Sequence, residues 1–318
     1  MRAFVFPGQG SQAVGMGREL AEAFPTARLV FEEVDDALSQ KLSRLMFEGD
    51  ERDLTLTENA QPALMAVSLA VVRVLEQEGG FELAERASFV AGHSLGEYSA
   101  LCAARCLGLD DTARLLKRRG LAMQRAVPVG TGAMAALLGL ELEAVRAIAE
   151  AARTDPETGL EEVCAPANDN APGQVVVSGH KDAVDRAVAL AAEQGARRSI
   201  ILPVSAPFHC ALMQPAADEM AEALGEVTLA PPAAPLISNV TASPQSDPAA
   251  IRRLLVEQVT GLVRWRESVA AMRALGVEQL VELGAGKVLT GLARRIDREL
   301  SAVAIGQPAE VESFLRAE

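Results

Sequence analysis

The stretch VAGHSLGEYSA, residues 90–100, sets a serine between two glycines where an apolar run gives way to a helix-like segment. Residues 88–91 predict a short buried strand, and the residues after Gly96 predict a helix. A sharp turn between strand and helix forces Ser94 toward sparsely populated backbone angles, and the flanking glycines relieve collisions between the two elements. The stretch therefore predicts an α/β fold in which a strand delivers Ser94 to a helix N-terminus.

The same residues match the G-x-S-x-G pattern of a nucleophile elbow, over residues 92–96. A hydroxyl held at this position projects from a helix N-terminus, whose amides favour a developing negative charge. The alternative is a tight turn with no chemical role, because five-residue patterns also arise by chance. The strand before the turn and the helix after it favour a catalytic serine.

The composition favours the same fold class. Of the 318 residues, 49% are apolar but only 3% are aromatic, so the core is built from Ala, Val, Leu and Ile, as in folds with buried parallel strands. The net charge of −13 argues against broad nucleic-acid binding. No apolar run approaches the ~20 residues of a membrane-spanning helix, and the N-terminal apolar stretch is too short for a signal peptide. We therefore expect a soluble cytoplasmic protein that binds neither nucleic acid nor membrane.

The four cysteines are too few and too scattered for a disulfide framework. Cys102 and Cys106 lie one helical turn apart, but no other ligands are evident nearby, so we interpret them as small core residues. The sequence thus predicts no metal site, and we expect no bound cofactor.

A change of pattern at PVGTG, residues 128–132, indicates a domain boundary. Outside the boundary, the predicted elements are strands at 3–6, 88–91, 235–239, 278–283 and 302–305 and helices at 60–78 and 110–126. After it, the pattern predicts strands at 133–140, 162–167, 175–178 and 197–202 and helices at 141–152 and 181–194. The order β-α-β-β-α-β is that of a ferredoxin-like unit. We predict a large α/β domain, residues 1–129 and 205–318, with an inserted small domain, residues 130–204.

A catalytic serine needs a base, and the chain has only three histidines. His93 neighbours the serine, so its side chain should point away from the elbow. His180 follows Ser178-Gly179 at a predicted helix start, where a solvated or capping role is the simpler interpretation. His209 lies in a proline-punctuated loop before a helix and is the leading candidate for the base. Cys210 is unattractive as the nucleophile, since adjacent residues rarely reach nucleophile–base geometry.

Motifs spaced along the whole chain resemble those of the malonyl-CoA:acyl carrier protein transacylase family. They occur in the family's order: FPGQGSQ (6–12), GMG (15–17), GHSLGEYSAL (92–101), RGLAMQ (119–124), GTGAMAA (130–136), ANDNAPGQVVVSG (167–179), PVSAPFH (203–209), SNVTA (238–242) and ELGAGKVL (282–289). The resemblance implies a hydrolase-like parallel-sheet body with an inserted ferredoxin-like small domain.

The resemblance also implies catalytic roles. Ser94 is similar to the nucleophile that takes the malonyl group as an ester, and His209 is similar to its general base. In the family a backbone carbonyl orients this histidine, and Gln258 holds the matching position. Gln9 and Leu95 match the two oxyanion-hole positions, which act through backbone N–H groups.

Four residues are candidates for contact with the substrate. Arg119 resembles the arginine whose guanidinium binds the free carboxylate of a malonyl thioester through two charge-assisted hydrogen bonds; the alternative is a solvated charge on a helix. Asn168 and Asn170 resemble polar residues that line the cleft from the small domain. Phe208 either narrows the acyl pocket against branched methylmalonyl groups or is a packing residue.

The resemblance predicts transfer of a malonyl group from malonyl-CoA to the phosphopantetheine thiol of holo acyl carrier protein, by a ping-pong mechanism in fatty-acid synthesis. We expect a monomer. Carrier proteins are acidic, so basic groups are candidates for docking, although most such clusters are solvated faces. The candidates are Lys117 to Arg119, Arg197-Arg198, Arg252-Arg253, Arg264 with Arg266, and Lys287 with Arg294-Arg295.

Three alternatives remain open. A serine esterase or thioesterase shares the elbow but uses water as the acceptor; that class normally places an acid and then a late histidine after the serine. A non-catalytic carrier-binding module would not need Ser94, His209 and Arg119. A malonyl transferase can also serve a malonate decarboxylase or a polyketide carrier.

Overall fold

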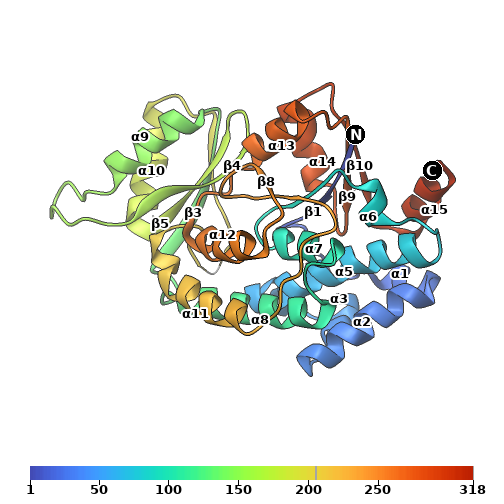
Figure 1. Ribbon diagram of the computed structural model, residues 1–318. Helices are drawn as coiled ribbons and strands as arrows, with labels where there is room; N and C mark the ends of the chain where they lie inside the picture. Colours follow the sequence, from blue (N-terminus) through green and yellow to red (C-terminus); the bar gives the residue numbers. More distant parts are fainter. Residues whose placement is uncertain (205, 318) are drawn as a thin grey trace.

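Two sheets organise the chain, which the computed structural model describes over residues 1–204 and 206–317 (Figure 1). Their strands are β1 (Arg2–Phe6), β2 (Phe89–Gly92), β3 (Gly132–Leu138), β4 (Cys164–Ala171), β5 (Gln174–His180), β6 (Arg198–Ile201), β7 (Leu236–Ile237), β8 (Pro244–Gln245), β9 (Gln279–Leu283) and β10 (Ser301–Ile305). The helices before the second sheet are α1 (Arg18–Ala23), α2 (Pro25–Leu38), α3 (Leu42–Glu48), α4 (Glu51–Thr55), α5 (Thr57–Gln77), α6 (Leu83–Arg86), α7 (Gly96–Ala103) and α8 (Leu109–Arg125). The remaining helices are α9 (Leu142–Ala152), α10 (Lys181–Glu193), the short 3₁₀ turn Ala211–Met213, α11 (Gln214–Gly225), α12 (Pro248–Thr260), α13 (Trp265–Ala274), α14 (Val288–Ile296) and α15 (Pro308–Ala317).

The first sheet has the strand order β10-β9-β1-β2-β7-β8, and its first five strands are parallel. Only β8 pairs antiparallel, at the edge. Alternate residues of β1 enter two different cores, as the period of a strand requires. Phe4 and Phe6 pack with residues of α2, α5 and α8, whereas Ala3 and Val5 pack with residues of α13 and α14. The sheet is therefore covered by helices on both faces, and the predicted α/β class with a parallel sheet is confirmed.

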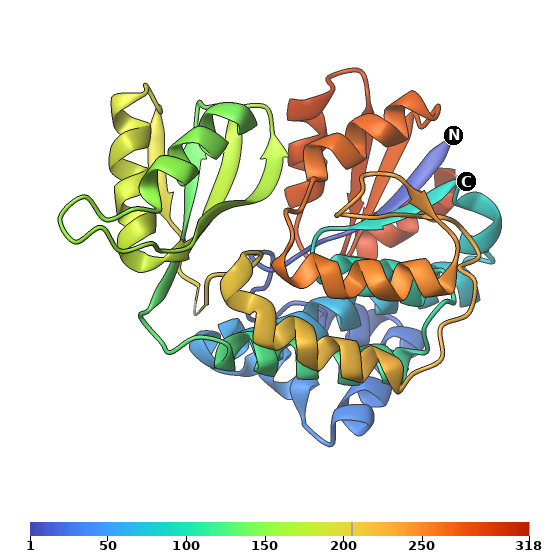
Figure 2. The same ribbon diagram turned by 60° about the vertical axis from the view of Figure 1, so that its left-hand side comes forward.

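The second sheet is antiparallel and has the strand order β4-β5-β3-β6. Helices α9 and α10 pack against it around a core of its own, in which Leu137, Val145, Val177 and Ala187 are buried. Figure 2 shows this sheet and its two helices as a lobe beside the rest of the chain.

The edge strand β4 is bound to the start of α13 and to the residues just before it. The amide of Asp169 donates to the carbonyl of Val263, and the amide of Val263 donates to the carbonyl of Ala167, both at 2.9 Å. The carboxylate of Asp169, only 1% exposed, accepts hydrogen bonds from the guanidinium of Arg266. We call this contact the lobe clasp. It holds β4 in place relative to the end of α12.

Most predicted strands differ from the observed ones by one or two residues at an end, and two of the differences bear on the site. The strand predicted at 235–239 ends at Ile237, because the chain turns out of the sheet so that the Asn239 side chain can reach Gly92 and Ser94. The strand predicted at 162–167 instead runs to Ala171 as β4, with register irregularities along its pairing with β5. Residue 205, where we predicted that the large domain resumes, lies outside the described residues. Among those described, no helix is both long and apolar enough to cross a membrane.

Candidate active site

The turn after β2 places Ser94 in a left-handed backbone conformation, with φ of +53°. Such a conformation is uncommon outside glycine and indicates a turn that the surrounding structure imposes. Both glycines of the pattern are required by contact. A Cβ on Gly92 would lie 1.8 Å from the carbonyl carbon of Gly96, and a Cβ on Gly96 would lie 2.2 Å from the carbonyl oxygen of Phe6. Strand β2 and helix α7 therefore approach each other closely enough only with glycine at both positions.

Ser94, His209 and Gln258 form a continuous chain of hydrogen bonds. Oγ of Ser94 lies 2.9 Å from Nε2 of His209, and Nδ1 of His209 lies 2.8 Å from the backbone carbonyl oxygen of Gln258. A carbonyl oxygen can only accept, so Nδ1 carries the proton and Nε2 is free to accept from the serine hydroxyl. The orienting group is thus a backbone carbonyl at the end of α12, where a Ser-His-Asp triad has a carboxylate.

Burial keeps His209 neutral. The side chain is 4% exposed, and burial together with the nearby positive charge of Arg119 lowers its pKa from 6.5 to about 3. A neutral imidazole whose Nε2 accepts from a hydroxyl is the state that a general base requires.

Arg119 points from α8 into the same site and is only 1% exposed. Its Nη2 donates to Oγ of Ser94 at 3.1 Å and to Oε1 of Gln258 at 2.8 Å, while Nη1 donates to Oε1 of Gln61 at 2.9 Å. Its guanidinium also lies over the ring of Tyr98, at 5.7 Å from the centroid. Burial lowers the pKa of Arg119. Within the described residues no carboxylate forms an ion pair with it, and its Nε has no hydrogen-bond partner.

Two amide side chains hold the backbone of Ser94 from both sides. Oδ1 of Asn239 accepts from the Ser94 amide at 2.8 Å, and Nε2 of Gln258 donates to the Ser94 carbonyl at 2.9 Å. The backbone amide of Asn239 and the side-chain Nε2 of Gln258 also donate to the buried carboxyl group of Glu97. Burial raises the pKa of Glu97 to about 8, against the lowering effect of its hydrogen bonds and of Arg119.

A cavity of about 430 Å³ opens over Ser94. The residues expected from the sequence that line it are Gln9, Ser94, Leu95, Arg119, Asn168, Phe208 and His209. Gln258 is not among the lining residues; it contacts three of them, Ser94, His209 and Arg119, by hydrogen bonds. Where the structure describes the chain, the backbone amides of Gln9 and Leu95 have no acceptor, so both are available to a ligand in the cavity.

His93 lies beside this cavity but is turned away from Ser94. Its Nε2 is 2.8 Å from Oδ1 of Asn170, and its ring packs against Trp265. The basic residues next to Arg119 are held within the chain: Lys117 bonds to Asn59. Arg118 forms ion pairs with carboxylates of α11 and of the residue after it, Glu219, Glu222 and Glu226. Lys117 and Arg118 keep 24% and 33% of their side chains exposed, so their contact with solvent or a carrier stays a prediction.

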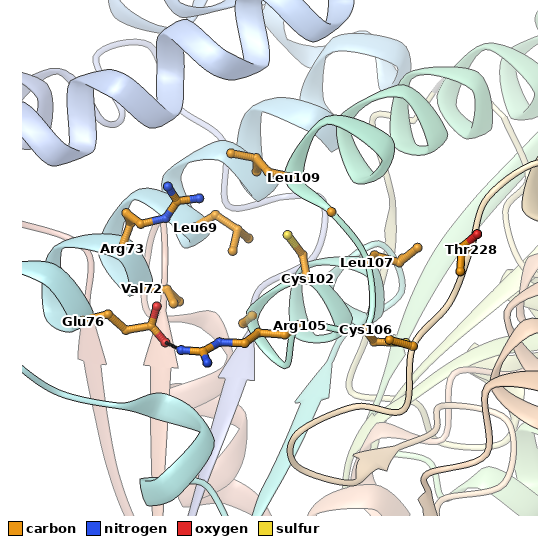
Figure 3. A pocket seen from close by; sticks show the side chains of 13 residues that line it. Leu69, Val72, Arg73, Glu76, Cys102, Arg105, Cys106, Leu107, Leu109 and Thr228 are labelled. Carbon is orange, nitrogen blue, oxygen red and sulfur yellow. Dashed lines mark ion pairs between the residues drawn. The ribbon is translucent and has the colours of Figure 1, made fainter.

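A second cavity, of about 500 Å³, lies at the other end of α7, between α5 and the start of α8 (Figure 3). Arg73, Glu76 and Arg105 line it together with Cys102 and Cys106. Burial raises the pKa of Cys102 to about 12 and that of Cys106 to about 11, so both thiols are protonated near neutral pH. This cavity contains neither Ser94 nor His209 and is separate from the site.

Comparison with known proteins assigns the chain to a family. Residues 3–307 match the acyl transferase domain family. The malonyl CoA-acyl carrier protein transacylase of Bacillus subtilis strain 168 is 45% identical over 310 residues, covering 98% of this chain and 95% of the relative. The chain belongs to the malonyl CoA-acyl carrier protein transacylase family. It is an acyltransferase.

Solved structures of the family superpose on the whole chain. The acyl-carrier-protein-S-malonyltransferase of Bartonella henselae is 57% identical, with a TM-score of 0.94 and coverage of 99% of this chain and 98% of that one. A type II PKS acyl-carrier protein in complex with its malonyl-transacylase gives a TM-score of 0.94 at 42% identity, covering 100% and 99% of the two chains. These structures have the same arrangement of one parallel and one antiparallel sheet.

Three residues of the site were not singled out from the sequence. Gln61, Glu97 and Asn239 are buried polar side chains that contact the catalytic candidates. Gln61 is a polar residue in the otherwise apolar run of α5, which is a signal for a buried contact. Glu97 and Asn239 stood inside motifs that matched the family, yet their partners lie far away in sequence, so no local pattern could have joined them.

Proposed function

We propose that the chain transfers a malonyl group from malonyl-CoA to the phosphopantetheine thiol of acyl carrier protein. One observation carries the proposal: Arg119, a buried arginine that forms no ion pair with any described carboxylate, lines the cavity beside Ser94. A buried guanidinium selects an acyl group that ends in a carboxylate, because the two can form parallel charge-assisted hydrogen bonds. An acetyl group has no atom that could replace this contact.

In the first half-reaction, Oγ of Ser94 attacks the thioester carbonyl while Nε2 of His209 takes its proton. The Gln258 carbonyl accepts a hydrogen bond from Nδ1–H, which keeps its proton, and so stabilises the imidazolium that forms. The amides of Gln9 and Leu95 would donate to the oxyanion, which is worth about 3–4 kcal/mol for each donor. The C–S bond then breaks, coenzyme A leaves as a thiol after taking the proton from His209, and a malonyl ester remains on Ser94.

The second half-reaction reverses these steps with a different thiol. The phosphopantetheine thiol of the carrier gives its proton to His209 and attacks the ester carbonyl. Collapse of the intermediate breaks the C–O bond, and Ser94 recovers its proton. Two substrates that use one nucleophile in turn give ping-pong kinetics.

The substrate carboxylate also acts on the base. The charge of Arg119 contributes to the lowered pKa of His209. A malonyl carboxylate bound to Arg119 neutralises this charge, so the pKa of His209 rises when the correct acyl group is in place. We infer that a carboxylate-bearing substrate binds to Arg119 and also makes His209 a stronger base. An acetyl group leaves the pKa of His209 low.

The remaining lining residues set the shape of the acyl site. Phe208 is 8% exposed and adjoins the base, and Asn168 enters the cavity from β4. We propose that Phe208 limits branching at the carbon between the two carbonyl groups and that Asn168 bonds to the thioester arm.

The finer fold assignment is also a proposal. The order β4-β5-β3-β6, with one helix after β3 and one after β5, supports a ferredoxin-like small domain at residues 130–204. The strand–elbow–helix at Ser94 in a parallel sheet supports a hydrolase-like large domain at residues 1–129 and 205–318.

The carrier is proposed on two grounds. The names of the relatives include the acyl carrier protein, and one solved relative is a complex with its acyl-carrier protein. Of the predicted basic groups, Arg197 and Arg198 are exposed at β6, and in the described part of the chain no carboxylate lies within ion-pair distance of either. We propose that this pair meets the acidic carrier. The fatty-acid pathway, the cytoplasmic location and the monomeric state stay predictions.

Intact-protein mass measurement tests the function. The protein is mixed with malonyl-CoA alone and then with holo carrier protein. We expect one malonyl adduct per chain, which disappears when the carrier is added and reappears on the carrier. Ser94→Ala should give no adduct, whereas Ser99→Ala, which removes a buried hydroxyl of α7 without a hydrogen-bond partner, should be labelled normally. Fast repeated release of malonate without the carrier would instead identify a thioesterase.

A further inference from the structure

Glu97 is a buried carboxyl group behind the nucleophile that the mechanism above does not use. It lies in the first turn of α7 and is 1% exposed. Its Oε1 accepts from the backbone amide of Asn239 at 2.6 Å, and its Oε2 accepts from Nε2 of Gln258 at 2.5 Å. Each oxygen thus has a defined donor, and each donor belongs to a residue that touches Ser94.

The two donors connect Glu97 to the whole catalytic set. Asn239 holds the amide of Ser94, and Gln258 holds its carbonyl. These contacts fix both peptide bonds of the strained turn. Gln258 further accepts from Arg119 through Oε1, and its backbone carbonyl accepts from His209.

The orientation of the Gln258 amide depends on Glu97. With an acceptor at residue 97, the Gln258 nitrogen faces Glu97 and the carbonyl of Ser94, so its oxygen faces the donor Arg119. The reversed amide would place oxygen against the Ser94 carbonyl and nitrogen against the guanidinium, and both contacts would be repulsive. A single acceptor therefore sets the three hydrogen bonds of the Gln258 side chain, to Glu97, to the Ser94 carbonyl and from Arg119.

We propose that Glu97 is a positioning residue for acyl transfer: its two carboxyl oxygens fix Asn239 and Gln258, which in turn hold Ser94 and Arg119 in register with His209. The inference rests on the proposed function, since it assigns a role within that reaction. Glu97 touches neither the substrate nor the reacting atoms.

A glutamine at this position separates the role from simple packing. In either protonation state, both oxygens of Glu97 keep a lone pair, whereas the side-chain nitrogen of glutamine has none to offer. The Asn239 amide is a fixed backbone donor, so the oxygen of the new side chain must face it. Its nitrogen then faces Gln258 and reverses that amide, with little change in volume.

The test is single-turnover malonylation of Ser94 by rapid quenching and intact mass, on the full chain. We expect Glu97→Gln to lower the acylation rate constant about 100-fold, the usual effect of a misplacement near 1 Å. The loss should be the same within a factor of about three for malonyl-CoA and acetyl-CoA. The malonyl-CoA concentration at half-saturation should change much less than the rate constant, because Gln61 still holds Arg119.

Glu282 provides the matched control. It is also a 1% exposed glutamate whose two oxygens accept from backbone amides, those of Leu289 and Thr290, and burial raises its pKa as well. Glu282→Gln makes the same chemical change away from Ser94. It should lower the melting temperature but leave the acylation rate within about threefold of the wild type. An equal loss of rate in both variants would reduce the role of Glu97 to general stability and overturn the proposal.

The outcomes for the function and for this inference are distinct. If the wild-type protein takes no malonyl group, the proposed function fails. If the wild type is malonylated and Glu97→Gln is malonylated at the same rate, only the positioning role fails. Should Glu97→Gln not fold, Glu97→Asp is measured instead: it keeps the carboxyl group but is shorter by one methylene and cannot reach both donors. A wild-type rate in that variant would also overturn the proposal.

Discussion

Replacing Arg119 by alanine is the most direct perturbation of substrate choice. The change removes the guanidinium from the cavity and leaves Ser94, His209 and the Gln258 carbonyl in place. A malonyl group then enters a site in which its carboxylate has no charged partner. An acetyl group loses nothing of this kind, so the two substrates should respond differently.

The size of the effect follows from burial. Arg119 is 1% exposed, and removing one partner of a buried ion pair costs about 3–5 kcal/mol. Since each 1.36 kcal/mol is tenfold in rate, kcat/KM for malonyl-CoA should fall about 150- to 5,000-fold. For acetyl-CoA only the hydrogen bond of Arg119 to the nucleophile, Oγ of Ser94, bears on the rate, and at about 0.5–1.5 kcal/mol its loss should lower kcat/KM about 2- to 13-fold.

The assay follows the free thiol of coenzyme A during transfer to holo carrier protein, with each acyl-CoA in turn. Arg119→Lys is the matched variant: it keeps the charge but not the planar fork, so it should fall between the wild type and alanine for malonyl-CoA. Loss of malonyl and acetyl transfer by the same factor in Arg119→Ala would refute carboxylate recognition by Arg119.

Four further outcomes are expected. Because the pKa of His209 is about 3 in the free protein, kcat/KM for malonylation should be constant between about pH 5 and 7; a fall in kcat/KM with a midpoint near 6.5 would contradict a neutral buried base. The folded-state pKa of Glu97, about 8, lies above its ordinary value of 4.5, so the folded chain binds the extra proton and stability is lost as pH rises through 8. In urea denaturation, Glu97→Gln should therefore gain stability relative to the wild type between pH 5 and 8, and an opposite trend would exclude the raised pKa. Gly92→Ala should lower the free energy of unfolding by about 3 kcal/mol and abolish malonylation, and a stable labelled variant would disprove the tight strand–helix contact. Arg197→Glu combined with Arg198→Glu should slow transfer to the carrier at low salt without slowing malonylation by malonyl-CoA. Unchanged transfer would show that the carrier docks on another surface.

Much of the architecture is visible in local patterns. The strand at residues 88–91, the apolar helix at 60–78 and the six elements between 133 and 202 each have a period or a boundary residue that predicts them, and each has an observed counterpart. The elbow is equally local, because its two glycines and serine lie within five residues. These features depend on neighbours in sequence, which a single chain reveals.

The site beyond the elbow depends on contacts between distant segments. Asn239 lies at the end of a predicted strand, and nothing nearby shows that its side chain turns back to Ser94. The lysine and arginine before Arg119 look alike in sequence, yet Arg119 is buried in the cavity while Arg118 is bound by carboxylates of α11. Which face of α8 meets which helix is decided by tertiary packing.

The lobe clasp has a consequence for the length of the chain between Gln258 and Arg266. At one end of this segment a backbone carbonyl orients His209, and at the other end Val263 and Arg266 grip β4. Both ends are fixed by partners in other parts of the fold, so the distance between them is set. Side chains along the segment can vary, but an inserted or deleted residue would have to displace either the imidazole or the second sheet. In this segment the spacing of residues matters more than their identity.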